Sequence, residues 1–182
     1  MNGLELNIIE YCGTGLSCNI YAISLLKNLK ELRLNAAGIN DISFIHPLNK
    51  IEELECVINN IVDISPLKNL ILLKCLTLGE NSIKNLSPLE NLVNLEKLDF
   101  SGNCVISLAP ITKIKNLKYI DFLYQRPLIK DLTPLKQLKN LEIRVTVGNN
   151  LFDDSLASYN EIKRVAEKSK NILGLIKGDY KM

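Results

Sequence analysis

The stretch from Leu73 to Asn94 reads LKCLTLGENSIKNLSPLENLVN, and the stretch from Leu95 to Asn116 reads LEKLDFSGNCVISLAPITKIKN. Both place aliphatic or aromatic residues at positions 1, 4, 6, 11, 14, 17 and 20 and asparagine at position 9. Two earlier copies, which begin at Leu29 and Ile51, keep the same 22-residue register, and a fifth copy from Leu117 is 24 residues long. This spacing indicates a chain built from one repeated structural unit.

Positions 4 and 6 of each copy alternate with outward neighbours, as Leu76 and Leu78 do around Thr77. This alternation predicts a short strand with one buried face. The Ser87-Pro88 step favours a tight turn or a 3₁₀ segment on the opposite side of the unit. Asparagine at position 9 suits a ladder of buried amides that bond the backbone where the chain leaves the strand. The predicted ladder residues are Asn59, Asn81 and Asn103.

The L-x-x-L-x-L-x-x-N spacing, from roughly Leu6 to Leu141, resembles leucine-rich repeats. It is similar to the short 22-residue class found in bacterial internalins and in a regulatory subunit of a protein phosphatase. The resemblance implies a right-handed α/β solenoid with a curved parallel sheet on the concave side and short turns or 3₁₀ segments on the convex side. It implies less about activity, because the same scaffold carries many functions.

With 182 residues, the chain is predicted to form a single domain. Residues 1–28 are an imperfect copy that serves as the N-terminal cap, and residues 29–140 hold the five repeats. Residues 141–182 are predicted to add a final strand, with Val145 and Val147 facing inward, and a capping helix. One face of that helix carries Leu156, Tyr159, Ile162 and Ala166.

Composition narrows the possible partners and compartments. The formal charge of +2 comes from 22 basic and 20 acidic residues, without the basic excess that nucleic-acid binding requires. The N-terminal residues show no export signal, and no apolar run approaches the roughly 18 residues of a membrane span. Five irregularly spaced cysteines favour free thiols in a reducing compartment. We therefore expect a cytoplasmic protein without membrane insertion, whose oligomeric state the sequence leaves open.

Residues with catalytic potential are few. His46, the only histidine, lies beside Pro47 in an expected outer turn. This lone histidine gives no Ser-His or Cys-His constellation of the kind used in nucleophilic catalysis. Cys56 occupies an inward position and is predicted to be packed, whereas Cys75 should face out from its strand. We expect no catalytic residue, no cofactor and no metal.

The outward strand positions 3, 5 and 7 form the candidate binding face. From the strand at Ile8 to the strand at Tyr119 they hold six acidic and two basic residues, a charge of −4. A partner with a basic surface is implied, and the alternative is a face whose charges serve only solvation. Ile58, Glu80 and the insertion around Arg126 adjoin this face. The candidate partner-binding residues are Glu53, Glu55, Val57, Asp99, Tyr119, Asp121, Leu123 and Tyr124.

These features predict a non-catalytic module that binds another protein through the sheet face and the adjoining loops. Its leading role is that of an intracellular adaptor or inhibitor, such as a regulator or an immunity protein. The alternative is a fragment of an internalin-like secreted or surface adhesin. An enzyme with a site in the C-terminal unit is the third and most remote option.

Overall fold

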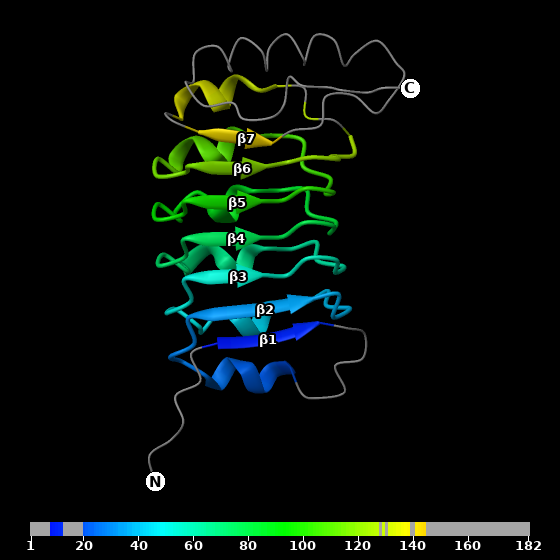
Figure 1. The fold of residues 1–182 in the computed structure, drawn as a ribbon, viewed down its shortest axis with the longest axis vertical. Helices are drawn as coiled ribbons and strands as arrows, with labels where there is room; N and C mark the ends of the chain where they lie inside the picture. Colours follow the sequence, from blue (N-terminus) through cyan, green and yellow to red (C-terminus); the bar gives the residue numbers. More distant parts are fainter. Residues whose placement is uncertain (1–7, 13–19, 128, 130, 139–140, 145–182) are drawn as a thin grey trace.

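The computed structural model describes residues 8–12, 20–127, 129, 131–138 and 141–144. In these residues, seven short strands form one parallel sheet in which the strands follow their order in the sequence (Figure 1). Each strand begins one coil of a stack, as the repeat predicts. The strands are β1 (Ile8–Cys12), β2 (Glu31–Asn35), β3 (Glu53–Glu55), β4 (Cys75–Thr77), β5 (Lys97–Asp99), β6 (Tyr119–Asp121) and β7 (Glu142–Arg144).

The pairing of the strands follows the repeat. Leu76 lies opposite Leu54 on β3 and Leu98 on β5, so each step along the sheet is 22 residues. The step is 23 residues at both ends, where Ile9 pairs with Leu32 and Ile120 pairs with Ile143. Leucines at the same repeat position therefore stack directly on one another, and nearly all inward positions are fully buried. The predicted aliphatic core is thus continuous from Leu29 to Ile143.

Short 3₁₀ turns lie on the side of each coil opposite the sheet (Figure 1). Proline occupies the first turn of the last four, where its fixed φ suits the conformation. At repeat position 13, a side-chain oxygen accepts the backbone N–H of the residue two positions later. Asp63 accepts the N–H of Ser65 at 2.8 Å, and Asn85 accepts the N–H of Ser87 at 2.9 Å. The turns are η1 (Ile20–Leu25), η2 (Ser43–Ile45), η3 (Ser65–Asn69), η4 (Ser87–Leu89), η5 (Ala109–Lys113) and η6 (Thr133–Gln137).

Buried amides at position 9 connect neighbouring coils. Asn103 Oδ1 accepts the N–H of Ile83 at 2.9 Å, and its Nδ2 donates to the carbonyls of Leu78 and Phe100 at 2.9 and 3.0 Å. Asn81 and Asn59 make equivalent bonds one and two coils earlier, respectively. Gln125 does the same one coil later, where its Oε1 accepts the N–H of Val105 and its Nε2 donates to Phe100. Each amide therefore satisfies backbone groups that the bend after the strand leaves without a partner.

The first described coil packs on the core through Tyr11, Ile20, Ile23 and Leu26, which are partly buried. Val145, Val147 and the expected capping helix lie outside the described residues. In the described ranges, no helix has the length and apolar character needed to cross a membrane.

Candidate functional site

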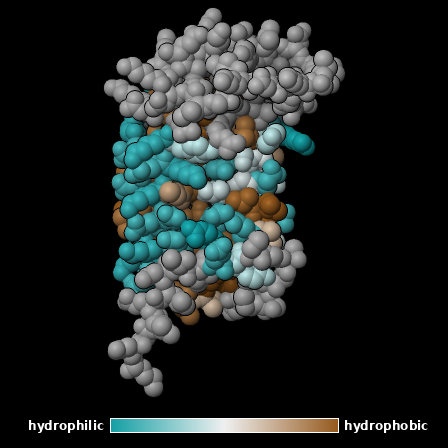
Figure 2. Space-filling view, viewed as in Figure 1, coloured by the Kyte–Doolittle hydropathy of each residue, from teal (hydrophilic) through white to brown (hydrophobic). Residues whose placement is uncertain are grey.

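The sheet face is the outward surface of β2 to β6, and most of its side chains are half-buried. Figure 2 shows that hydrophilic surface covers much of this side and that hydrophobic surface gathers near the ends of the middle strands. The sheet-face residues are Glu31, Arg33, Glu53, Glu55, Cys75, Thr77, Lys97, Asp99 and Tyr119.

An acidic cluster occupies the half of this face formed by β2 and β3. Arg33 Nη2 lies 3.1 Å from Glu31 Oε2 and 3.3 Å from Glu53 Oε2, and its Nε lies 3.5 Å from Glu55 Oε2. Three carboxylates therefore surround one guanidinium, and the acidic cluster keeps a charge of −2. Asn35 Nδ2 also donates to Glu55 at 2.6 Å. These contacts order the carboxylates while leaving Glu53 45% and Glu55 36% exposed.

A shallow hollow of about 200 Å³ lies beside the acidic cluster, above β4. Its floor holds the small side chains of Cys75 and Thr77, and its walls carry Glu53 and Glu55 on one side and Lys97 on the other. Ligand pockets measure roughly 300 to 1,000 Å³. The hollow is therefore sized for one side chain of a partner rather than for a cofactor. Cys75 faces outward as predicted and is a free thiol, and burial raises its pKa.

The other half of the face differs from its sequence-based prediction at Asp121. This carboxylate is only 3% exposed, accepts the N–H of Leu123 at 3.1 Å and accepts the hydroxyl of Tyr119 at 3.2 Å. Asp121 is therefore a buried acceptor, which corrects its assignment to the exposed binding face. Tyr119 is engaged as well, because Lys97 Nζ lies 5.6 Å from the centre of its ring. Asp99 and Leu123 are half-buried beside them.

A rim of residues in the left-handed backbone region follows the strands. Repeat position 8 has a positive φ in five successive coils, from 51° at Ala36 to 62° at Gly102. Ile58 and Tyr124 on this rim are 59% and 53% exposed, and Glu80 is exposed too. Sequence reasoning placed Ile58, Glu80 and Tyr124 next to the face but missed their backbone conformation. Gly102 was the only signal at this position that could have indicated it. The rim consists of Ala36, Ile58, Glu80, Gly102 and Tyr124.

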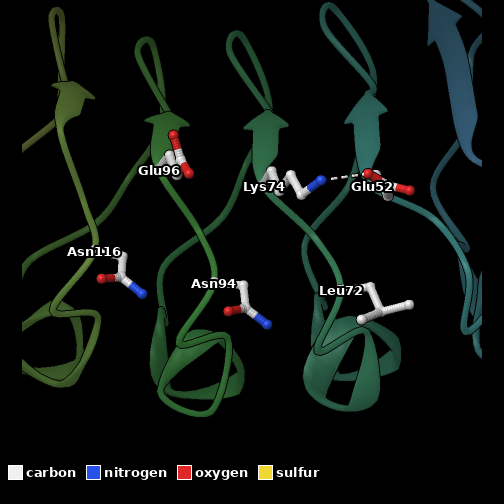
Figure 3. A pocket seen from close by; sticks show the side chains of 6 residues that line it. All are labelled: Glu52, Leu72, Lys74, Asn94, Glu96 and Asn116. Atoms are coloured by element: carbon white, nitrogen blue, oxygen red, sulfur yellow. Dashed lines mark hydrogen bonds and ion pairs between the residues drawn. The ribbon is translucent and has the colours of Figure 1, made fainter.

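A second hollow, of about 280 Å³, lies along the flank where the strands begin (Figure 3). Charges alternate at repeat position 2 on this flank, and Lys74 Nζ reaches Glu52 at 2.6 Å while Lys118 Nζ reaches Glu96 at 2.6 Å. The hydrogen bond lowers the pKa of Glu52 and raises the pKa of Lys74. The polar groups of this hollow are thus used in joining coils. The charge ladder comprises Lys30, Glu52, Lys74, Glu96 and Lys118.

Groups with catalytic potential are not brought together in the described part of the chain. His46 is exposed next to η2. Cys56 is fully buried, and burial raises the pKa of its thiol to about 12. No group of three or more histidine, cysteine or acidic side chains among these residues is arranged to hold a metal ion.

Comparison with known proteins agrees with the repeat. The sequence model of a family described as Leucine Rich repeats (2 copies) matches residues 93–137. No curated protein matches the sequence. Among solved structures, the internalin InlC2 from Listeria monocytogenes is 29% identical with a TM-score of 0.63, and the match covers 70% of this chain and 58% of InlC2.

A second internalin of that organism, InlF, is 28% identical with a TM-score of 0.62, over 85% of this chain and 52% of InlF. A leucine-rich repeat protein from Leptospira interrogans has a TM-score of 0.69 at 23% identity, over 76% of this chain and 36% of that protein, and this likeness concerns the fold alone. The chain therefore spans little more than half the length of the two internalin structures. Its 22-residue repeats form a leucine-rich repeat fold, and they resemble those of the bacterial internalins.

Proposed function

We propose that this chain is a non-catalytic module that binds a partner protein with a basic surface through the sheet face and the rim. The acidic cluster is the observation that carries the proposal, because its three carboxylates share a single guanidinium. Without the buried Asp121, the remaining outward positions from β1 to β6 hold five acidic residues, including Glu10, against Arg33 and Lys97. This charge of −3 contrasts with +2 for the whole chain. This negative charge would therefore attract a basic partner during encounter and orient it on the face.

The size of the sheet face requires that loops take part in binding. Five strands spaced about 4.8 Å apart give a projected area on the order of 300 Å². A standard interface buries roughly 800 Å² on each partner. The rim adjoins the strands along the whole stack, so it is the natural extension of the contact.

Two roles fit such a module. A cytoplasmic adaptor or inhibitor, for example a regulator or an immunity protein, would use the face to block or recruit a basic partner. An internalin-like secreted or surface adhesin is the second candidate, and the similarity to InlC2 and InlF favours it. Fractionation of the native cell separates the two, because an adhesin would be recovered outside the cytoplasm.

Affinity capture from a lysate of the native cell, with mass spectrometry, tests the binding face. Replacing Glu53→Gln together with Glu55→Gln raises the net charge by about two units, and we expect this variant to lose the partner. The matched control, Val62→Lys with Ile106→Lys, adds the same charge at exposed sites outside the sheet face. The control should still capture the partner. Equal capture by the wild type and both variants would contradict binding through this face.

A further inference from the structure

We propose that the partner is anchored beside β3 by a large apolar side chain on Val57 and Ile58, while a neighbouring lysine or arginine reaches Glu53 and Glu55. This inference rests on the proposed function and specifies its partner. The recognised segment carries a basic residue two positions from a large aliphatic or aromatic one.

Ile58 is the first observation, because its conformation is costly within this chain. Its φ is 57°, a region in which β-branched residues are genuine outliers, and its side chain is 59% exposed. Glycine occupies the same repeat position at Gly102, so the backbone does not require a bulky residue there. Because most of the Ile58 side chain is exposed, its burial within the described part of the chain compensates for little of this strain. Strain of this kind points to a functional role at the surface.

Val57 extends the apolar surface of Ile58 and is held firmly. Its N–H donates to Asn35 Oδ1 at 2.8 Å, and its carbonyl accepts the N–H of Ala36 at 2.8 Å. The next coil carries the buried Gly79 at the equivalent position, and Ser101 Oγ and Asp99 Oδ1 of the coil beyond lie where its side chain would be. Hydrophobic surface gathers near the ends of the middle strands in Figure 2. An apolar side chain of the partner would therefore contact the half-buried Val57 and the exposed Ile58 themselves, and not Gly79.

The acidic half of the site lies on the same coil. Glu53 and Glu55 are paired with Arg33 on the β2 side, whereas their neighbours on β4 are the uncharged Cys75 and Thr77. A cation entering the hollow of about 200 Å³ above β4 therefore approaches a cluster that keeps a charge of −2. Lys97 on the far wall is held over the ring of Tyr119.

The two halves are close enough for two residues of one partner segment to fill them. Glu55 and Val57 are two positions apart along an extended chain, which separates their side chains by about 6.6 Å. Side chains two positions apart in an extended partner segment lie on one face and span the same distance. The site is therefore specific for a short basic and apolar pair rather than for positive charge alone.

Paired glycine substitutions at the rim give a sharp test. Ile58→Gly removes the strain together with the anchor, so we expect an unchanged or higher Tm and an affinity at least tenfold weaker. Ala36→Gly is the matched control, since Ala36 has a φ of 51° at the same repeat position. It should leave the affinity unchanged. If Ile58 had no binding role, Ile58→Gly would change the Tm and leave the affinity unchanged.

The probe is a set of four synthetic peptides in a Gly-Ser background, each with one glycine between two varied central positions, which hold Arg and Leu, Glu and Leu, Arg and Ser, or Ser and Ser. We expect the Arg-Leu peptide to shift the NMR amide signals of Glu55, Val57, Ile58 and Thr77 in the ¹⁵N-labelled protein, more than any other peptide does. Ile58→Gly should weaken these shifts at least tenfold. No shifts at millimolar peptide, or equal shifts with Arg-Ser, would overturn the proposal.

Two further results separate this inference from the proposed function. A captured partner that is lost with Glu53→Gln and Glu55→Gln but retained with Ile58→Gly would refute the apolar anchor and leave the proposed function standing. Shifts of the Ile58 signal that depend on protein concentration without peptide would assign this surface to a second copy of the chain, and would also overturn the proposal.

Discussion

At the residue scale, the amide at position 9 is the side chain on which each coil most depends. Asn103 is 1% exposed and makes hydrogen bonds with both its own coil and the preceding one. Gln125 performs the same task with a longer side chain, which shows that the amide group rather than its exact reach is what this position needs.

Asn103→Ala should lower the free energy of unfolding by about 1–3 kcal/mol, because it leaves the buried N–H of Ile83 without its acceptor, whereas the carbonyl of Leu78 keeps its bond from Asn81. Asn94→Ala is the matched control, since the Asn94 amide bonds the Ile71 carbonyl at an exposed site. It should cost less than about 1 kcal/mol. Urea denaturation measures both variants, and equal losses would refute a special role for the buried amide.

Gly102→Ala tests the left-handed rim. An added Cβ would lie 2.5 Å from Glu80 Cδ, but that exposed side chain can rotate away. The φ of 62° remains, and it costs an L-residue about 1–2 kcal/mol. We therefore expect the same loss of stability in the wild-type and Glu80→Ala backgrounds. A loss that disappears with Glu80→Ala would show that the steric contact dominates instead.

At the element scale, each coil joins the next through the sheet, the buried amides and the charge ladder. The charge ladder alternates in sign from Lys30 to Lys118, so each side chain faces an opposite charge on the adjacent coil. Pairing between coils two apart would bring like charges together. The ladder thus favours contact between consecutive coils, while the buried leucines impose the strand register.

The stabilisation by the Glu52–Lys74 pair should depend on pH at both ends of the range. The pKa of Glu52 is lowered, so its contribution is present above the ordinary glutamate pKa of about 4.3 and is lost as the pH falls through the folded value. The pKa of Lys74 is raised, so its contribution is present below about 10.4 and is lost as the pH rises through the folded value.

The difference in Tm between the wild type and Lys74→Met should therefore be largest between these two limits and shrink outside them. Lys84→Met is the control, because Lys84 forms no ion pair with the described residues. Its Tm difference should not vary in this way. A constant difference for Lys74→Met across the pH range would argue against the ion pair.

At the scale of the whole molecule, the stack has two ends where the core must be covered. β7 is the last strand of the sheet in the described residues, and the predicted cap beyond it lies outside them. An uncovered coil would present apolar side chains and strand edges to other molecules.

Deletion of residues 153–182 should therefore cause aggregation or loss of soluble expression. Light scattering and size-exclusion chromatography of the truncated protein, compared with the full chain at equal concentration, provide the measurement. A truncated protein that stays monomeric and keeps the Tm of the full chain would show that this segment is an appendage.

The solenoid could be predicted from the sequence because its signal repeats. An inward leucine such as Leu76 or Leu98 recurs every 22 residues, and five agreeing copies overcome the ambiguity of any short apolar run. The outward direction of Glu53, Glu55 and Cys75 follows from the same register, since side chains alternate along a strand. For the proposed binding surface, the sequence thus determined the face and most of the residues on it, Asp121 excepted.

Only the tertiary structure decided what those residues do for one another. Asp121 has the outward pattern of an exposed acid, yet contacts with Leu123 and Tyr119 make it a buried acceptor. Ile58 carries no sequence mark of a left-handed φ, because that conformation is imposed by the bend between stacked coils rather than by its own preference. Pattern determines the direction of a side chain locally, whereas its burial, its strain and pairs such as that of Arg33 with Glu53 depend on how the coils stack.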